Sequence, residues 1–414
     1  MHVHIIGGGI IGLSSAWYLQ EAGIKVTLID RNELEDGTSH GNAGMLVPSH
    51  FVPLAAPGVI TQGLRWLLDS KSPFYIKPRL NLDLAQWLWQ FYRSCTPQHV
   101  ARAMPILHAY NEWSKTLYEN FAQLPDFDFA FEKKGLLMLF QEEALGKEEA
   151  ELAEKAHDLG MEAQLLDADA VKALEKGTRV EALGGVYYPG DAHLYPNRFL
   201  QQLVKALKNA GVEFITGRSL TDFRAESGQV KSILLDDQTE LPVEHLVLAA
   251  GSWSAQLLKK LKYRLLLQDG KGYSFTLQEP GERPHIPTIL TEAKVAVTPM
   301  GKDLRIGGTL EISNLSDRVN TSRLAGIVES MPRYYPDIKV ETPALKTVWH
   351  GFRPCTPDGL PYMGYPKAYS NLMLATGHAM MGMSMGPASG KLVAQMIMGQ
   401  ATDISVDLFK PDRF

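Results

Sequence analysis

The chain has 414 residues, of which 45% are hydrophobic, so it is long enough to bury two domain-sized cores. A net charge of −5 gives no basic footprint, which argues against nucleic acid as a partner. Two cysteines and twelve histidines, none with metal-ligand spacing, predict reduced thiols in a reducing compartment, no disulfide framework and no bound metal.

Residues 4–30, HIIGGGIIGLSSAWYLQEAGIKVTLID, predict a strand, a glycine-rich turn, a helix and a second strand that ends in an acid. Gly7, Gly9 and Gly12 fill a G-x-G-x-x-G motif, which indicates a dinucleotide site when it stands in this context. Gly7 permits the tight turn, Gly9 lets the backbone approach a pyrophosphate, and Gly12 allows the helix to pack closely on the strand. Asp30 is expected to accept hydrogen bonds from ribose hydroxyls and to repel a 2′-phosphate.

The N-terminus is apolar, but glycines interrupt it and no basic region precedes it. We therefore expect a strand there and not a signal peptide, which favours a cytoplasmic location. No uninterrupted apolar run reaches the length of a membrane span. The most lipid-like stretches, residues 59–68 and 84–91, are expected to form helices that belong to the core or to a substrate lid. The alternative is peripheral attachment to the inner face of the cell membrane. The aromatic residues available for a lid include Trp66, Tyr75, Trp87 and Trp89.

The rest of the chain has no internal repeat and no low-complexity linker. Residues 51–189 read as mostly helical with Trp- and Tyr-rich faces, whereas residues 259–343 show alternating strands. The other expected elements are a helix at Pro196–Gly211, a strand at Glu213–Ile215, a β-meander from Val230 to Pro242, a buried parallel strand from His245 that ends at Gly251, a strand at Leu372–Ala375, a loop at Gly377–Gly382 and a helix at Pro387–Met398.

Nucleotide-binding elements recur at three separated places, which predicts a discontinuous domain of residues 1–50, 190–258 and 344–414. The intervening residues 51–189 and 259–343 then form a substrate domain that caps one end of the cofactor. The fold class expected is α/β plus α+β, with a Rossmann-like domain joined to a second domain of mixed sheet and helices.

Four internal motifs and the C-terminus share a likeness with one protein family. They are TSHGNAGMLVP (Thr38–Pro48), KGYS (Lys271–Ser274), WHGFRPCTPDGLPYMG (Trp349–Gly364), TGHAMMGMSMGPASG (Thr376–Gly390) and the final Arg413-Phe414. With these motifs, and over essentially its whole length, the chain resembles the D-amino-acid oxidase superfamily of FAD-dependent oxidoreductases. The likeness is nearest to the bacterial D-amino-acid dehydrogenase branch.

The resemblance implies that the Rossmann-like domain binds FAD, and that it does so non-covalently. The cysteine that links flavin in sarcosine oxidases would fall at Gly351, and Cys355 is displaced from that position. His40 lies one residue out of register with the flavin-linking histidine of dimethylglycine enzymes and is left as a minor alternative. The residues implied to contact FAD are Gly7, Gly9, Ile10, Ile11, Gly12, Asp30, Arg31, Ser39, Asn42, Ala43, Gly44, Met45, Ala250, Gly251, Trp253, Gly351, Gly377, His378, Gly382 and Met383.

Two residues are expected to hold the substrate. Arg353 is the candidate for the substrate carboxylate, because a guanidinium forms two parallel hydrogen bonds with a planar anion. Its alternative is a structural ion pair with Asp358. Tyr273 is expected to donate a second hydrogen bond to the same carboxylate, and its alternative is a core aromatic residue on a strand.

The last helix has an implied electrostatic use. The resemblance puts its N-terminus, near Gly382 and Met383, at the pyrimidine side of the flavin, where a helix dipole would stabilise the reduced cofactor. His378 is expected to shape the flavin site, or to be a loop histidine with a structural hydrogen bond. Glycine oxidases carry arginine where this chain has Met380, which disfavours that activity.

The function expected is oxidative deamination of a D-amino acid by hydride transfer from Cα to flavin N5, giving a 2-oxo acid and ammonia. The partners expected are the amino acid and a quinone or another electron carrier, and an oligomer is left open. The alternatives are a D-proline or D-hydroxyproline dehydrogenase, an oxidase of the glycine or sarcosine type that produces H₂O₂, and a non-catalytic flavin-binding or electron-transfer subunit. Sequence does not separate an oxidase from a dehydrogenase, because oxygen access depends on small cavities.

Overall fold

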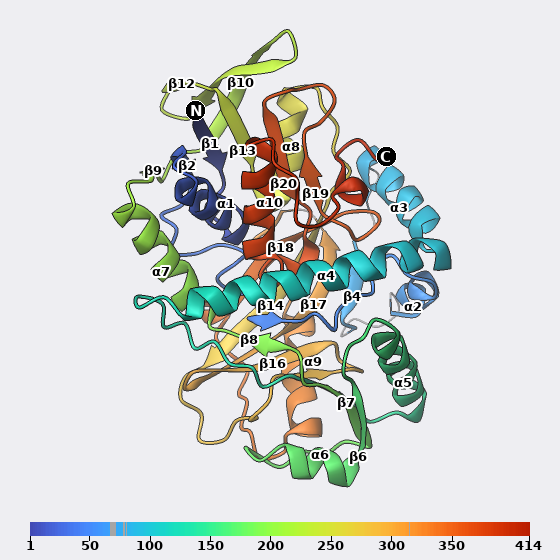
Figure 1. The fold of residues 1–414 in the computed structure, drawn as a ribbon. Coiled ribbons are helices and arrows are strands. Elements are labelled where there is room, and N and C mark those ends of the chain that lie inside the picture. The colour runs from blue at the N-terminus through green and yellow to red at the C-terminus, as the bar shows by residue number, and fades with distance from the viewer. Residues whose placement is uncertain (67–71, 78, 80, 314) are drawn as a thin grey trace.

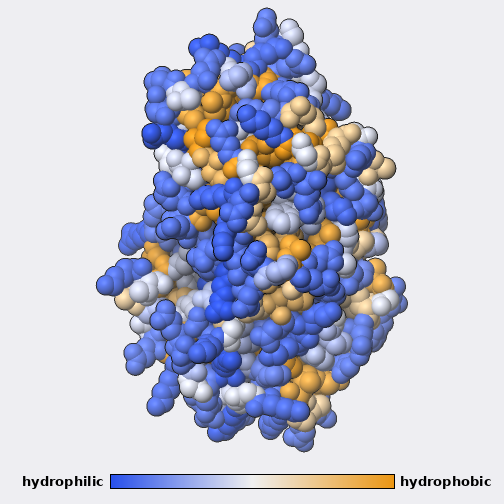
Figure 2. Space-filling model, turned by 60° about the vertical axis from the view of Figure 1, so that its left-hand side comes forward, coloured by the Kyte–Doolittle hydropathy of each residue, from blue (hydrophilic) through white to orange (hydrophobic). Residues whose placement is uncertain are grey.

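A computed structural model describes residues 1–66, 72–77, 79, 81–313 and 315–414. It has the mixed α/β architecture expected, with a parallel sheet at one end of the molecule and a larger, mostly antiparallel sheet at the other (Figure 1). Between these two ends, helix α4 (Pro97–Ala122) crosses the middle of the molecule. The face drawn in Figure 2 is largely hydrophilic, and its apolar residues form separate patches.

The parallel sheet is built around the glycine-rich motif. Its six strands lie in the order β19-β20-β13-β1-β2-β9, and all neighbouring pairs are parallel except β19 with β20. Its inner strands are nearly continuous buried apolar runs, as expected for strands covered on both faces. The strands are β1 (His2–Ile6), β2 (Lys25–Ile29), β9 (Glu213–Ile215), β13 (His245–Leu248), β19 (Tyr362–Gly364) and β20 (Leu372–Thr376).

Different elements cover the two faces of this sheet. Helices α1 (Ile10–Glu21), α7 (Pro196–Asn209) and α10 (Gly386–Ile397) share one apolar core with α4. The opposite face packs against helix α8 (Ser254–Lys260) and a three-stranded meander. The meander consists of β10 (Leu220–Glu226), β11 (Gln229–Leu235) and β12 (Glu240–Pro242). The predicted helix, meander and parallel strands of this part are confirmed.

The larger sheet is the central element of the other half of the molecule, opposite the parallel sheet. Its strand order is β18-β14-β17-β16-β15-β5-β7-β6, with β4 beside β17, and only the pairs β15–β5 and β17–β4 are parallel. Helix α9 (Thr321–Tyr334) shares its core. The strands are β4 (Phe74–Ile76), β5 (Leu136–Phe140), β6 (Gln164–Asp167), β7 (Gly184–Tyr188), β14 (Gln268–Leu277), β15 (Thr288–Leu290), β16 (Val295–Met300), β17 (Asp303–Ser313) and β18 (Trp349–Cys355).

The segment expected to be mostly helical contains both kinds of element. It holds α2 (Val59–Trp66), α3 (Leu82–Ser94), α4, α5 (Glu143–Asp158) and α6 (Ala168–Leu174), but also strands β4 to β7. Strand β5 has the sequence LLMLF, and a short apolar run of this kind has no periodicity that separates a strand from a helix. Residues 67 and 68 of the expected first lid helix lie outside the described residues.

Two elements lie across the domain division expected from sequence, which remains a prediction. Strand β18 was assigned to the FAD-binding segments, yet it pairs with β14 in the larger sheet. Helix α4 was assigned to the substrate segments, yet it packs on α10, and its Tyr118 hydroxyl donates to the carbonyl of Met383, just before α10, over 2.7 Å. Strand β18 and helix α4 therefore each contact the half of the molecule to which they were not assigned.

Candidate active site

A cavity of about 800 Å³ lies between the two sheets. The carboxyl ends of β1, β2, β13 and β20 form one wall, which is the edge where open parallel sheets bind their ligands. Strands β14, β17 and β18 of the larger sheet form another wall, and the volume is within the range usual for ligand sites.

The glycine-rich turn has the geometry that the motif predicts. Gly7 has φ +110°, and a Cβ there would lie 2.5 Å from the Ala249 carbonyl oxygen. A Cβ on Gly12 would overlap the Gly7 carbonyl oxygen, so the absence of a side chain lets α1 start directly against the turn. Helix α1 has no acidic residue in its first turn, so its N-terminus is suited to an anion.

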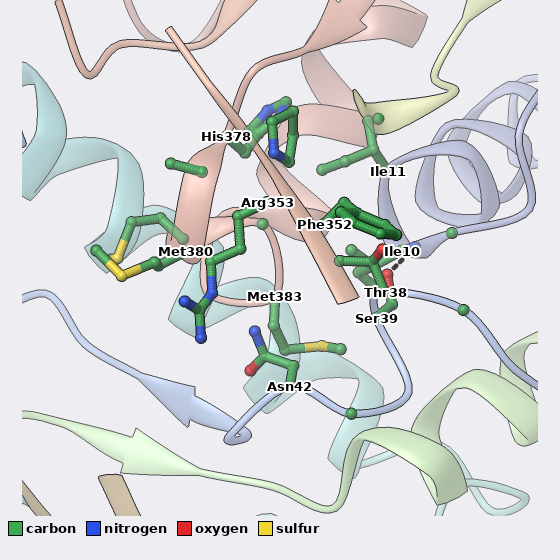
Figure 3. A pocket seen from close by; sticks show the side chains of 18 of the residues that line it. Ile10, Ile11, Thr38, Ser39, Asn42, Phe352, Arg353, His378, Met380 and Met383 are labelled. Carbon is green, nitrogen blue, oxygen red and sulfur yellow. Dashed lines mark hydrogen bonds between the residues drawn. The ribbon is translucent and has the colours of Figure 1, made fainter. Parts of the chain in front are cut away.

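Two side chains order the backbone around this turn. The Asp30 carboxylate accepts hydrogen bonds from the Gly8 N–H over 2.6 Å and from the Asn32 N–H over 2.8 Å. The Ser39 hydroxyl accepts from the Ile10 N–H over 3.0 Å, as the dashed line in Figure 3 marks. Each Asp30 oxygen keeps a further lone pair that can accept from a hydroxyl. Its hydrogen bonds to the ribose of a cofactor stay a prediction.

Most of the cofactor-binding residues expected from sequence come together in this cavity. Sixteen of the twenty line it: Gly7, Gly9, Ile10, Ile11, Asp30, Arg31, Ser39, Asn42, Ala43, Met45, Ala250, Gly251, Trp253, His378, Gly382 and Met383.

The other four are glycines that stand behind the cavity wall. Gly12 lies in the first turn of α1, against the Gly7 carbonyl, as described above. Gly44 has φ +70° and faces the Leu194 carbonyl, and Gly377 has φ +84°, with a Cβ position 2.6 Å from Thr356. Gly351 is covered by the indole of Trp349. These glycines therefore shape the wall without lining the cavity.

Several further lining residues were not singled out from sequence. They include Gly8, Asn32, Thr38, Arg218, Trp349 and Phe352. Trp349 lies across Gly41 as well as Gly351, and its indole N–H donates to the Gly37 carbonyl over 3.1 Å. Gly41 and Gly351 were the signal in the sequence that a large side chain lies against the backbone here. To identify that side chain as Trp349, one must know that β18 contacts residues 37–41, and the sequence does not show this contact.

Arg353 points into the cavity, between Met380 and Asn42 in Figure 3. It comes from β18, opposite Gly270 of β14, and its guanidinium lies across Gly272, where a Cβ would be 2.6 Å from Nη1. Nη1 donates to the Thr309 carbonyl. Burial lowers the pKa of Arg353 from its ordinary value, although a guanidinium stays charged in proteins. In the part of the chain that the structure describes, no acceptor takes a hydrogen bond from its other N–H groups, so these can face an anion.

A β-bulge supplies the Thr309 carbonyl. Between the pairs Lys271–Glu311 and Tyr273–Gly308, two residues of β17 stand opposite the single Gly272 of β14. Thr309 is one of the two, and it has φ +69°, which is rare for a β-branched residue. The bulge turns its carbonyl toward the guanidinium.

The alternative in which Arg353 pairs with Asp358 is wrong. The Asp358 carboxylate accepts from Arg413, over 2.7 Å from Nε and 2.9 Å from Nη2. None of the ion pairs among the described residues involves Arg353.

Tyr273 fits both of its expected readings in part. It lines the cavity, but it is only 1% exposed and belongs to the core of the larger sheet. Its hydroxyl accepts from the Asn320 N–H over 3.2 Å and donates to Glu311 over 3.4 Å, and burial raises the pKa of Tyr273 to about 12. Because the single hydroxyl proton goes to Glu311, donation to a substrate carboxylate requires a different arrangement and stays a prediction.

The last helix begins later than the resemblance implied. Helix α10 starts at Gly386, whereas Gly382 and Met383 lie in the turn before it and line the cavity. His378 also lines the cavity and is bonded to Ser389 of α10 over 3.0 Å. Burial lowers the pKa of His378 to about 3, so the ring is neutral near pH 7.

The two residues considered for a covalent flavin differ in position. Cys355 is fully buried, does not line the cavity, and has its pKa raised to about 12 by burial. His40 does line the cavity and is 5% exposed. Among the described residues, no group of three His, Cys, Asp or Glu side chains is arranged to hold a metal ion.

Apolar side chains from residues 51–91 and from the larger sheet also line the cavity. Trp87 lines it and donates its indole N–H to the Cys355 carbonyl over 2.9 Å. Tyr75 is outside the lining and lies under Arg323, 4.6 Å from its guanidinium carbon, and the Trp66 side chain is outside the described residues. The other apolar lining residues include Leu54, Phe74, Ile76, Phe91, Met138, Ile289 and Leu310.

Trp89 is on the surface, 59% exposed, stacked on Tyr92. Membrane attachment through such residues stays a prediction. Within the described parts of the chain, no helix combines the length and the apolar character that crossing a bilayer requires.

These features define a flavin-dependent oxidoreductase. The chain belongs to the family described as FAD dependent oxidoreductase, whose model matches residues 2–396. The start of α1, which carries no acidic side chain in its first turn, and the cavity wall that Gly7, Gly9 and Ile10 line fit the FAD that this family binds. The membership confirms the resemblance and the expected cofactor.

Particular relatives are similar over nearly the whole chain. The D-amino acid dehydrogenase of Helicobacter pylori (strain ATCC 700392 / 26695) is 30% identical over 407 residues, covering 98% of this chain and 97% of that protein. That of Bradyrhizobium diazoefficiens is 33% identical, covering 100% and 99%. Among solved structures, glycine oxidase from Geobacillus kaustophilus matches with a TM-score of 0.79 at 22% identity, covering 100% and 98%. L-proline dehydrogenase from P. horikoshii matches with a TM-score of 0.75 at 17% identity, covering 100% and 97%. The structural matches establish a shared fold.

Proposed function

We propose that this protein oxidises a D-amino acid to the corresponding 2-oxo acid and ammonia. The observation that carries the proposal is Arg353, a partly buried guanidinium that pairs with no carboxylate among the described residues and points into the cavity lined by the glycine-rich turn. A small zwitterion with a carboxylate and an apolar side chain suits a cavity that combines this guanidinium with many apolar lining residues. The relatives named D-amino acid dehydrogenase, at 30% to 33% identity, support the same substrate class.

In the mechanism we propose, Arg353 binds the carboxylate and fixes the orientation of Cα. The Thr309 carbonyl and the backbone of Gly272 hold the guanidinium in place, so little freedom is lost when substrate binds. Trp87, Phe91 and other apolar lining residues keep water away from Cα. FAD, when bound, supplies the acceptor for the hydride that leaves Cα. The resulting imine takes up water and releases ammonia, or stays a cyclic imine when the substrate is a secondary amine.

The electron acceptor in this proposal is a quinone or another carrier. Support comes from the relatives, which are named dehydrogenases. Peroxide production measured against dye reduction, with one good substrate under air, tests the point. If H₂O₂ forms in a stoichiometric amount, oxygen is the electron acceptor and the carrier is not needed.

An anaerobic flavin-reduction screen tests the central proposal. Holoprotein is mixed with D- and L-alanine, glycine, sarcosine and both prolines, and loss of the oxidised flavin band is recorded. We expect bleaching by D-amino acids, and none by their L-enantiomers. Formaldehyde release with sarcosine would indicate an N-methyl amine enzyme. If no amino acid bleaches the flavin, a non-catalytic flavoprotein is the better description.

A further inference from the structure

Three hydrogen-bonded polar side chains, His50, Ser49 and Asp191, form a series that begins at the cavity and ends at a fully buried carboxylate. His50 lines the cavity, and its Nδ1 lies 3.3 Å from the Ser49 hydroxyl. The Ser49 hydroxyl donates to Oδ2 of Asp191 in a short hydrogen bond, and the Ser49 N–H donates to Oδ1 over 3.1 Å. Asp191 is 0% exposed.

The hydrogen-bond order along this chain has one direction. A serine hydroxyl carries a single proton, and here that proton is given to Asp191. The contact between Ser49 and His50 then requires an N–H on Nδ1 of His50 as the donor. In a neutral ring, Nε2 is left with a free lone pair.

The surroundings keep His50 neutral. Burial, with a smaller contribution from Lys294, lowers the pKa of His50 to about 4. Lys294, in the turn between β15 and β16, also lines the cavity, and its positive charge acts on His50. A neutral histidine that lines the cavity can accept a proton, whereas a charged one cannot.

Asp191 is suited to hold a proton near neutral pH. Burial raises the pKa of Asp191 to about 7, against the bonds from Ser49. The charged groups that face it come from α4: Lys115 lowers its pKa and Glu112 raises it. Lys115 itself is bonded to Glu112 and to the Gly190 carbonyl, over 2.9 Å and 2.8 Å, so it does not neutralise Asp191 directly.

We propose that His50, Ser49 and Asp191 form a proton relay that deprotonates the ammonium group of the bound substrate. This inference rests on the proposed amino-acid oxidation, which needs a nitrogen lone pair to assist hydride departure. An N–H bond of the ammonium breaks, its electron pair stays on nitrogen, and Nε2 of His50 takes the proton. Nδ1 passes its proton to Ser49, and Ser49 passes its own to Asp191. One proton is moved in total, and no electron leaves the substrate in this step.

The principal test compares His50→Gln with His108→Gln. His108 contacts the adjacent Pro48 carbonyl over 3.5 Å but does not line the cavity, so its variant is the matched control. Anaerobic stopped-flow gives the rate of flavin reduction by one D-amino acid from pH 6 to pH 10. We expect His50→Gln to lower the rate at pH 7 on the order of 100-fold, and less at pH 10, where free substrate is already deprotonated. His108→Gln keeps the wild-type rate.

A spectroscopic readout separates the relay from a structural role. Binding of 2-methylalanine, which has no hydrogen on Cα, should add a protonated-carboxyl band to the infrared difference spectrum. We expect that band to be missing in Asp191→Asn and in His50→Gln. If Asp191→Asn does not fold, the His50→Gln experiment decides alone. A His50→Gln rate that equals wild type, or that falls by the same factor at every pH, overturns the relay. If wild-type flavin is not bleached by any amino acid, it is the proposed function that fails.

Discussion

The guanidinium of Arg353 lies across the backbone of Gly272 so closely that a Cβ at position 272 would be 2.6 Å from Nη1 and nearer still to Nη2. The two residues belong to neighbouring antiparallel strands, with Gly270 opposite Arg353 and Gly351 opposite Gly272. The glycine at this point of the KGYS motif is therefore part of the anion site, because its missing side chain is the space that the guanidinium occupies.

This contact predicts that Gly272→Ala displaces the guanidinium and weakens carboxylate binding by at least about tenfold, which corresponds to about 1.4 kcal/mol. A carboxylate inhibitor titrated against the flavin absorption band gives the dissociation constant. Gly270→Ala is the control, because its Cβ meets Leu310 and Cys355 and, of Arg353, only the backbone carbonyl oxygen at 3.4 Å. It should lower thermal stability and leave affinity close to wild type. Equal affinities for both variants would contradict the role given to Gly272.

Removing the charge itself has a larger predicted effect. Arg353→Met keeps much of the side-chain volume but deletes the hydrogen-bond donors, and we expect substrate binding to weaken by about 2 to 5 kcal/mol, the usual cost of breaking a buried charge pair. The rate of flavin reduction against substrate concentration measures this change.

Arg413→Met is the matched control for Arg353→Met. Arg413 is also a partly buried arginine, but its partner is Asp358, and their side chains are only 12% and 8% exposed. We expect that variant to lose about 3 to 5 kcal/mol of stability in urea unfolding while substrate affinity is retained. If Arg353→Met also binds substrate normally, another residue holds the carboxylate.

The parts of the site that were predictable from sequence are those encoded by local rules. The backbone geometry of one strand, turn and helix requires glycine at positions 7, 9 and 12, and Asp30 follows this motif at a fixed spacing. The apolar strands β13 and β20 could be assigned because a buried parallel strand is a continuous apolar run.

The features that escaped prediction depend on pairing across the sequence. The contact of Arg353 with Thr309 needs a bulge whose position follows from strand register, and short sequences specify register poorly. The partner of Asp358 is at the C-terminus, 55 residues away, and nothing local distinguishes Arg413 from Arg353 as its partner. The glycines Gly44, Gly351 and Gly377 were assigned to the cofactor because a family motif does not say which of its residues faces a ligand and which makes room for another residue.

Asp30 predicts a defect in cofactor binding. It orders the Gly8 and Asn32 amides at the cavity, so Asp30→Ala leaves both N–H groups without their acceptor. Loss of such a partner costs about 1 to 3 kcal/mol, which is about 5- to 150-fold in FAD affinity. Titration of apoprotein with FAD, followed by flavin fluorescence, measures it. Asp169→Ala is the control, because the Asp169 side chain is 97% exposed on α6 and does not line the cavity. Unchanged FAD affinity in Asp30→Ala would mean that the amides find other acceptors.

His378 predicts a loss of stability in acid. Burial depresses its pKa to about 3, whereas an unfolded histidine titrates near 6.5, so the unfolded chain binds more protons between these values. Its contribution is therefore fully present above about pH 6.5 and is lost as the pH falls toward 3, by up to roughly 4 kcal/mol. Urea unfolding from pH 7 to pH 4 should show a shallower acid dependence in His378→Gln than in wild type.

Other buried groups titrate in the same range, so the comparison must be between variants. The buried His4 and His193, both with pKa values lowered to about 4, add to the acid slope, whereas Asp191, with its pKa raised to about 7, opposes it. These contributions are shared by wild type and by His378→Gln, and they cancel in the difference. His285→Gln, which changes an exposed ring, should keep the wild-type slope. If His378→Gln also keeps the wild-type pH dependence, the His378 ring can be protonated in the folded protein at no cost in stability. The hydrogen bond between His378 and Ser389 would then not require a neutral imidazole.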